Sequence, residues 1–193
     1  MRNLKNQVRS IGKLQTRTDN NETDEMKIEG YFVVFNSETE IYDGMFEEIS
    51  DKAFKDIDLS DIRALADHDT AKVLGRTKSK TLTLKVDEKG LYGEITINKD
   101  DTEAVNLYQR VKRGDIDQCS FGFSILNETM EQREDGSTKW TITEIELFEV
   151  SVVTFPAYAD TSVEARSAQI EQMKQRNLQT RKQQLKERIT KWH

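Results

Sequence analysis

Alternation of apolar residues with small or polar ones over residues 118–125 of the segment QCSFGFSIL sets the narrowest limit on how this chain can fold. Side chains on a strand point alternately to opposite faces, so alternate residues share one environment. The apolar face carries Cys119, Phe121, Phe123 and Ile125. The opposite face carries Ser120, Gly122 and Ser124. The pattern predicts a strand with one face in a core, and one flat polar face suited to the floor of a cleft.

A second strand is predicted over TEIELFEVSVVTF, which ends at Pro156, the only proline. Simple alternation assigns one face to Phe148, Val150, Val152 and Thr154. It assigns the other face to Leu147, Glu149, Ser151 and Val153. A carboxylate among such residues is costly to bury unless it is paired or hydrogen-bonded. Glu149 is therefore a candidate for orienting a histidine, although an edge-strand glutamate facing water is the plainer interpretation.

The remaining local patterns predict a mostly β fold. GYFVVFN, residues 30–36, is rich in β-branched and aromatic residues and predicts a strand, and a short helix is expected at about residues 50–56. Alternation on both sides of DEKG predicts a hairpin over residues 80–97. A helix is expected between the capping Asp101 and Gly114. The fold class is α+β, mostly β with flanking helices.

Composition divides the chain into three parts. Residues 1–25 are polar and predict a flexible N-terminal arm, and residues 26–166 form the expected domain. Residues 167–193 predict a helical tail with a thin apolar stripe, which needs a partner to be firmly ordered. That tail holds seven Lys or Arg against two Asp or Glu, a net charge of +5, which leaves −11 for the rest of a chain whose total is −6.

Charge and hydropathy limit the classes of partner. An acidic body is poorly suited to hold nucleic acid phosphates, so no nucleic acid partner is expected. No apolar run approaches the roughly 20 residues that span a bilayer, so no membrane association is expected. MRNLKNQVRS lacks the apolar region of a secretory signal, which favours the cytoplasm. The single cysteine, Cys119, excludes an intrachain disulfide and a zinc site built on cysteines.

His68 is the only histidine besides the C-terminal His193, so imidazole chemistry within the body depends on it. It lies in ADHDT between two aspartates, which is too small a ligand set for a metal site. Cys119 is a poor nucleophile candidate, because its face of the strand predicts burial, which makes a thiol inert. Ser120, His68 and Glu149 supply the parts of a hydroxyl nucleophile, a base and an orienting group, although each alone has an ordinary structural explanation.

Four blocks of the sequence, in order, resemble the prohead proteases of tailed bacteriophages, also called capsid maturation proteases. GYFVVFNSETEIYDGMFEEISDKAF resembles the opening strand of that family and the acidic stretch that follows it. ALADHDTAKVLGRT resembles its histidine block, and GDIDQCSFGFSI resembles its serine block. ITEIELFEVSVVTFPAYADTSV resembles its closing block. The resemblance covers roughly residues 25–165.

The resemblance implies a fold related to the herpesvirus assemblins, a compact antiparallel β-barrel flanked by helices. It implies His68 as the general base and Ser120 as the nucleophile, with an oxyanion hole made of backbone N–H groups. The herpesvirus branch uses a second histidine, which this body lacks. Glu149 is therefore expected as the third member, ahead of Asp67 and Asp69, unless the site works as a dyad.

The resemblance also implies the function of a serine endopeptidase in procapsid maturation. The expected substrates are the scaffold, or the scaffold-like N-terminal segment of the major capsid protein, and the protease itself, for which a homo-oligomer is one of the open alternatives. The expected location is the phage procapsid within the bacterial host cytoplasm, and neither a cofactor nor a metal is expected. The alternative is a catalytically silent assembly or scaffold-associated protein of the same fold. A cysteine protease using Cys119 and a metallohydrolase are weaker alternatives.

Overall fold

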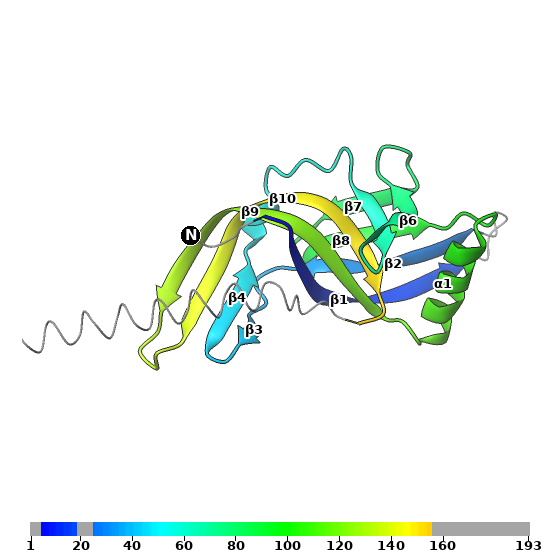
Figure 1. Ribbon diagram of the computed structural model, residues 1–193. Coiled ribbons are helices and arrows are strands. Elements are labelled where there is room, and N and C mark those ends of the chain that lie inside the picture. The colour runs from blue at the N-terminus through cyan, green and yellow to red at the C-terminus, as the bar shows by residue number, and fades with distance from the viewer. Residues whose placement is uncertain (1–4, 19–24, 156–193) are drawn as a thin grey trace, which may run out of the picture. The chain divides into compact units, whose positions relative to one another are not determined.

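A computed structural model describes residues 5–18 and 25–155, which form ten strands, one α-helix and one short 3-10 helix (Figure 1). The strands in chain order are β1 (Gln7–Thr18), β2 (Met26–Val34), β3 (Thr39–Tyr42), β4 (Met45–Ile49), β5 (Arg63–Ala66), β6 (Asp69–Arg76), β7 (Leu82–Val86), β8 (Gly90–Thr96), β9 (Gln118–Gln132) and β10 (Thr138–Val153). The helices are η1 (Asp51–Phe54) and α1 (Thr102–Arg113). The prediction of a mostly β fold is confirmed.

The strands follow the order β3-β4-β10-β9-β1-β2-β8-β7, with β5 paired to β10 and β6 paired to β5. Most neighbours are antiparallel, but β10 pairs in parallel with β4 and with β5. Within the described part of the chain, no pairing joins β3 to β7. The expectation of a closed antiparallel barrel is therefore not met, because the sheet stays open at both ends of this path.

The long antiparallel pair of β9 and β10 carries the predicted serine and glutamate strands, and Figure 1 shows the two ribbons side by side along their length. Both strands are longer than expected, because their pairing extends to Gln132 and Thr138. The polar residues 129–138 therefore form the ends of these strands and the tip of the hairpin between them. Gly136 takes the left-handed conformation there, with φ +88°.

A β-bulge in β10 overturns the simple alternation expected for that strand. Leu147 pairs with Phe123, but Glu149 already pairs with Gly122, so the register shifts between them. Leu147 therefore joins Val150 on the buried face, while the Phe148 side chain is 37% exposed. An extra residue on one strand of a pair changes the side on which later residues point.

Two local predictions are confirmed. Helix α1 begins after Asp101, whose carboxylate accepts hydrogen bonds from two backbone N–H groups of the first turn. It ends at Gly114, which has φ +86° and caps the last carbonyls. The hairpin of β7 and β8 is closed by Asp87, whose backbone N–H bonds the carbonyl of Gly90 over 3.0 Å. Helix α1 packs against β1 and β2.

The expectation of a flexible arm is wrong for Gln7–Thr18, which form β1 between β2 and β9. A polar sequence forms a stable strand where both neighbours accept its backbone hydrogen bonds. The domain boundary expected at residue 166 and the tail over residues 167–193 lie outside the described residues. No helix of the described part is long and apolar enough to cross a membrane.

Candidate active site

His68 lies in a two-residue turn between β5 and β6. Ala66 and Asp69 pair across this turn, and its two central residues both have positive φ, 48° for Asp67 and 60° for His68. Positive φ at both positions matches a type I′ hairpin turn. Aspartate and histidine tolerate this region better than most residues that carry a Cβ. The turn therefore presents the imidazole from a sharply defined backbone position.

Asp67 connects this turn to the end of β10 through hydrogen bonds. Its backbone N–H donates to the carbonyl of Val152 over 2.9 Å. Its carboxylate accepts a hydrogen bond from the Thr154 N–H over 2.7 Å and one from the Thr154 hydroxyl over 3.2 Å. The backbone and the carboxylate of Asp67 thus hold the turn against β10, so Asp67 positions the histidine turn rather than orienting the ring.

The structure brings His68 and Glu149 together. The Nδ1 atom of His68 lies 2.8 Å from Oε1 of Glu149, a hydrogen-bonding distance. The side chains are 23% and 14% exposed, so the contact is mostly shielded from water. The other ring nitrogen, Nε2, is buried and has no hydrogen-bond partner among the described residues. A carboxylate at Nδ1 leaves Nε2 as the nitrogen that can accept a proton.

The second oxygen of Glu149 binds Ser151, two residues along β10. The Ser151 hydroxyl donates to Oε2 over 2.5 Å. The carboxylate also lies directly over Gly122 of β9, because a Cβ added there would come within 2.3 Å of Oε1. Gly122 therefore leaves the space that the carboxylate occupies, and this fixes Glu149 on the same face of the sheet as Ser120.

Ser120 lies directly opposite Ser151 in the β9–β10 register. Its side chain is fully buried, and its hydroxyl donates a 2.8 Å hydrogen bond to the backbone carbonyl of Arg9 in β1. A series of neighbouring residues, partly along β10 and partly across strands, therefore links the three predicted residues. His68 contacts Glu149, Glu149 contacts Ser151, and Ser151 faces Ser120.

The weaker candidates lie elsewhere. Asp69 bonds the backbone N–H of Ala71 and lies 3.7 Å from the Lys72 ammonium, away from the imidazole contact. Cys119 is fully buried on the opposite face, where its thiol donates to the carbonyl of Tyr31 over 3.1 Å. Among the residues that the structure describes, no group of three or more metal-binding side chains occurs.

Two members of this constellation were not identified from the sequence. Ser151 shares a face with Glu149 by its spacing of two residues, a signal that was present but was given no role. The Arg9 carbonyl carries no sequence signal, because its position depends on the pairing of β1 with β9.

Comparison with known families gave one finding. A sequence model described as Caudovirus prohead serine protease matches residues 12–176 of the 193 in this chain. The match includes β5, β9 and β10, with all three predicted site residues. Comparison with curated proteins and with solved structures gave no match.

Proposed function

Because the chain belongs to the caudovirus prohead serine protease family, we propose that it is the endopeptidase that matures a phage procapsid. Ser120 is the nucleophile, His68 is the general base, and Glu149 orients the imidazole. The family is one of serine peptidases and implies capsid-related substrates. The shell scaffold, the scaffold-like N-terminal segment of the major capsid protein and the protease itself are the substrates that we propose.

The contact between His68 and Glu149 is the observation that carries this proposal. Glu149 accepts a hydrogen bond from the Nδ1–H group and so keeps the lone pair of the ring on Nε2. A general base needs such a lone pair within reach of the hydroxyl that it activates. The Nε2 atom has no hydrogen-bond partner among the described residues, and a serine hydroxyl can donate a hydrogen bond to it.

The reaction follows from these roles. Ser120 Oγ forms a bond to the carbonyl carbon of the peptide while its proton passes to His68 Nε2. The same proton then moves to the leaving amine as the peptide C–N bond breaks. Water then attacks the acyl carbon while its proton passes to His68 Nε2, and that proton moves on to Ser120 Oγ as the bond between Oγ and the acyl carbon breaks. Glu149 stays ionised throughout and stabilises the imidazolium that forms transiently.

Ser151 supports the orienting group. Its hydroxyl donates a hydrogen bond to Oε2 and so restricts the rotation of the carboxylate. Ser151 is itself a poor nucleophile candidate, because its proton is directed to Glu149 rather than to an imidazole. We therefore assign Ser151 as a positioning residue.

One observation favours the second candidate, a catalytically silent assembly protein. Ser120 is fully buried, and its proton is directed to the Arg9 carbonyl rather than to His68. A site that stayed in this state would not react. The endopeptidase remains the better proposal, because a silent protein has no need of a partly buried histidine–carboxylate contact.

The test compares the two serines that face each other, Ser120 and Ser151. A fluorophosphonate should label the native protein at Ser120, and Ser120→Ala should abolish both labelling and processing of co-expressed capsid protein. The loss of turnover should be about a million-fold. Ser151→Ala should keep labelling at Ser120, about tenfold more slowly, because one hydrogen bond to the carboxylate is lost. Normal processing by a folded Ser120→Ala protein would contradict the assignment.

The location proposed is the interior of the procapsid in the bacterial host cytoplasm. Co-expression with the capsid and scaffold proteins, followed by mass spectrometry of the shells and of the released fragments, tests the location and the substrates together.

A further inference from the structure

The edge of β9 that lies away from β10 is filled by the chain's own N-terminal residues. Gln7, Val8 and Arg9 pair with Phe123, Gly122 and Phe121 as an antiparallel strand. This edge belongs to the strand that carries Ser120, and the other edge of β9 is occupied by β10. An extended peptide that adds to β9 beside Ser120 must therefore use the place of Gln7–Arg9.

Gln7–Arg9 are separable from the rest of β1. The register with β9 shifts between Arg9 and Gly12, so the pairing of the two strands is irregular beside Ser120. The other end of β1, Leu14–Thr18, pairs with β2 and includes the buried Leu14. The family match begins at residue 12, after this irregularity. The N-terminal strand segment can thus leave β9 while the core half of β1 stays in place.

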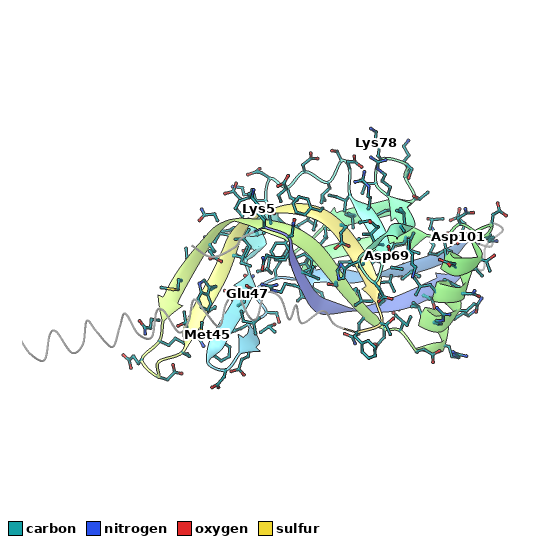
Figure 2. All side chains as sticks on the ribbon, in the orientation of Figure 1. Lys5, Met45, Glu47, Asp69, Lys78 and Asp101 are labelled. Atoms are coloured by element: carbon teal, nitrogen blue, oxygen red, sulfur yellow. The ribbon has the colours of Figure 1, made fainter. Side chains whose placement is uncertain are left out.

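Arg9 is held by both its side chain and its backbone. Its guanidinium forms a bidentate ion pair with Glu47 of β4, and the two side chains are only 9% and 4% exposed. Figure 2 labels Glu47 on its strand. The Arg9 carbonyl oxygen accepts the hydrogen bond from the Ser120 hydroxyl. Arg9 therefore pairs with the Glu47 carboxylate through its side chain and places its backbone carbonyl beside the Ser120 hydroxyl.

We propose that this edge of β9 binds the peptide substrate by strand addition, with Glu47 taking a basic side chain, and that Gln7–Arg9 occupy the site until displaced. The inference rests on the proposed function, because it takes Ser120 as the nucleophile. In this register the peptide bond presented to Ser120 follows a basic residue. The unreactive arrangement of Ser120 is then a property of the occupied site, since displacement frees the hydroxyl to turn to His68.

Charge reversal in the full-length chain tests the occupant. Arg9→Glu and Glu47→Arg each place like charges in the buried pair, so each should release the strand and raise the rate of fluorophosphonate labelling at Ser120. Loss of a charge-assisted bidentate pair predicts an increase of roughly tenfold or more. The double variant restores opposite charges and should label as slowly as the native protein.

Val8→Pro tests the same strand without touching the ion pair. Proline removes a backbone donor and weakens strand pairing, so labelling should again be faster. Cooperative thermal unfolding of each variant establishes that the body is folded. Labelling of Ser120→Ala measures any reaction at other sites. If the charge-reversal variants do not fold, the labelling rate of Val8→Pro decides whether Gln7–Arg9 cover Ser120.

Peptide competition tests the specificity of the site. The probe is the acetylated and amidated peptide KNQVRSIGK, residues 5–13 of this chain. It should protect Ser120 of the Arg9→Glu variant from labelling, and the same peptide with glutamate in place of arginine should do so roughly tenfold less well. Glu47→Arg should reverse that preference.

The outcomes separate the two proposals. Faster labelling of the single variants, slow labelling of the double variant and a reversed peptide preference support the inference. Equal labelling of native and folded variant proteins overturns the inference but leaves the serine protease intact. Absence of labelling in every protein overturns both.

Discussion

The two faces of β9 are buried to almost the same degree but by different interactions. Phe121 and Phe123 are inaccessible to solvent on one face, where their rings stack with centroids 4.7 Å apart. Ser120 is equally inaccessible on the other face, and Ser124 is 7% exposed. The apolar face is stabilised by non-directional burial, whereas the polar face depends on directed hydrogen bonds from neighbouring strands.

This difference between the two faces of β9 determines where the molecule tolerates substitutions. An apolar side chain can be shortened at a cost in stability without altering the geometry of a distant group. A polar side chain in the network from His68 to Ser151 cannot, because the hydrogen bonds that the two oxygens of Glu149 make to His68 and to Ser151 each depend on a fixed distance. Substitutions on the apolar face should therefore affect folding, and substitutions on the polar face should affect catalysis.

His68→Ala should produce the largest effect on the polar face, about a million-fold loss of turnover in a folded protein. The double variant His68→Ala/Ser120→Ala should be little worse than either single one, because the two residues act as one unit. Additive losses in the double variant, measured as peptide hydrolysis by the folded proteins, would remove His68 from this role.

Glu149→Gln should cost less, about ten-thousand-fold in turnover, because the orienting acid is the least costly member of a triad in a measured case. The amide retains the shape but loses the charge that stabilises an imidazolium. Glu146→Gln is the matched control, since Glu146 lies on the same strand opposite Ser124 and is exposed. Equal losses for the two variants would show that Glu149 has no special role.

Gly122→Ala should lower turnover by about a hundredfold, the scale expected when a catalytic group is displaced by roughly 1 Å. The new Cβ would come within 2.3 Å of Glu149 Oε1, so the carboxylate must move. Ser124→Ala removes a hydroxyl two residues along the same face and is the control. Kinetics and thermal unfolding together distinguish a displaced carboxylate from a misfolded strand, and unchanged turnover would mean that the carboxylate has room to move without consequence.

Features that depend on nearby residues were predictable from the sequence. Asp101 and Gly114 mark the ends of α1 through their own side-chain and backbone preferences. The apolar face of β9 follows from alternation alone, and all four of its residues are buried. Glu149 was singled out because a carboxylate in an apolar strand needs a partner. The sequence alone did not show that this partner is His68, since β5 reaches β10 only through sheet pairing.

Features that depend on long-range pairing were missed for the same reason. The strand β1 has a polar sequence, and it is a strand because β2 and β9 lie on either side of it. The bulge between Leu147 and Glu149 breaks an alternation that assumes a regular ladder. The hydrogen bond from Ser120 to the Arg9 carbonyl was missed for the first of these reasons, because it forms only where β1 lies beside β9.

Cys119→Ala should have the smallest effect on activity and is the sharpest test of the division between the faces. Cys119 is adjacent in sequence to Ser120 but fully buried on the apolar face, where its thiol bonds the Tyr31 carbonyl. The substitution removes one buried sulfur and one weak hydrogen bond, so unfolding free energy should fall by about 1 kcal/mol. Rates of peptide hydrolysis and of fluorophosphonate labelling should match the native protein.

Phe121→Ala extends the same test on the other side of Ser120, because it should lower unfolding free energy by about 3–5 kcal/mol through the cavity that it leaves. If the protein still folds, the labelling rate per folded molecule at low temperature should change far less than it does for Gly122→Ala. A well-folded Cys119→Ala protein without activity would instead make the thiol part of the site. The two faces of β9 would then not be separate in function, and the assignment of Ser120 over Cys119 would lose its structural basis.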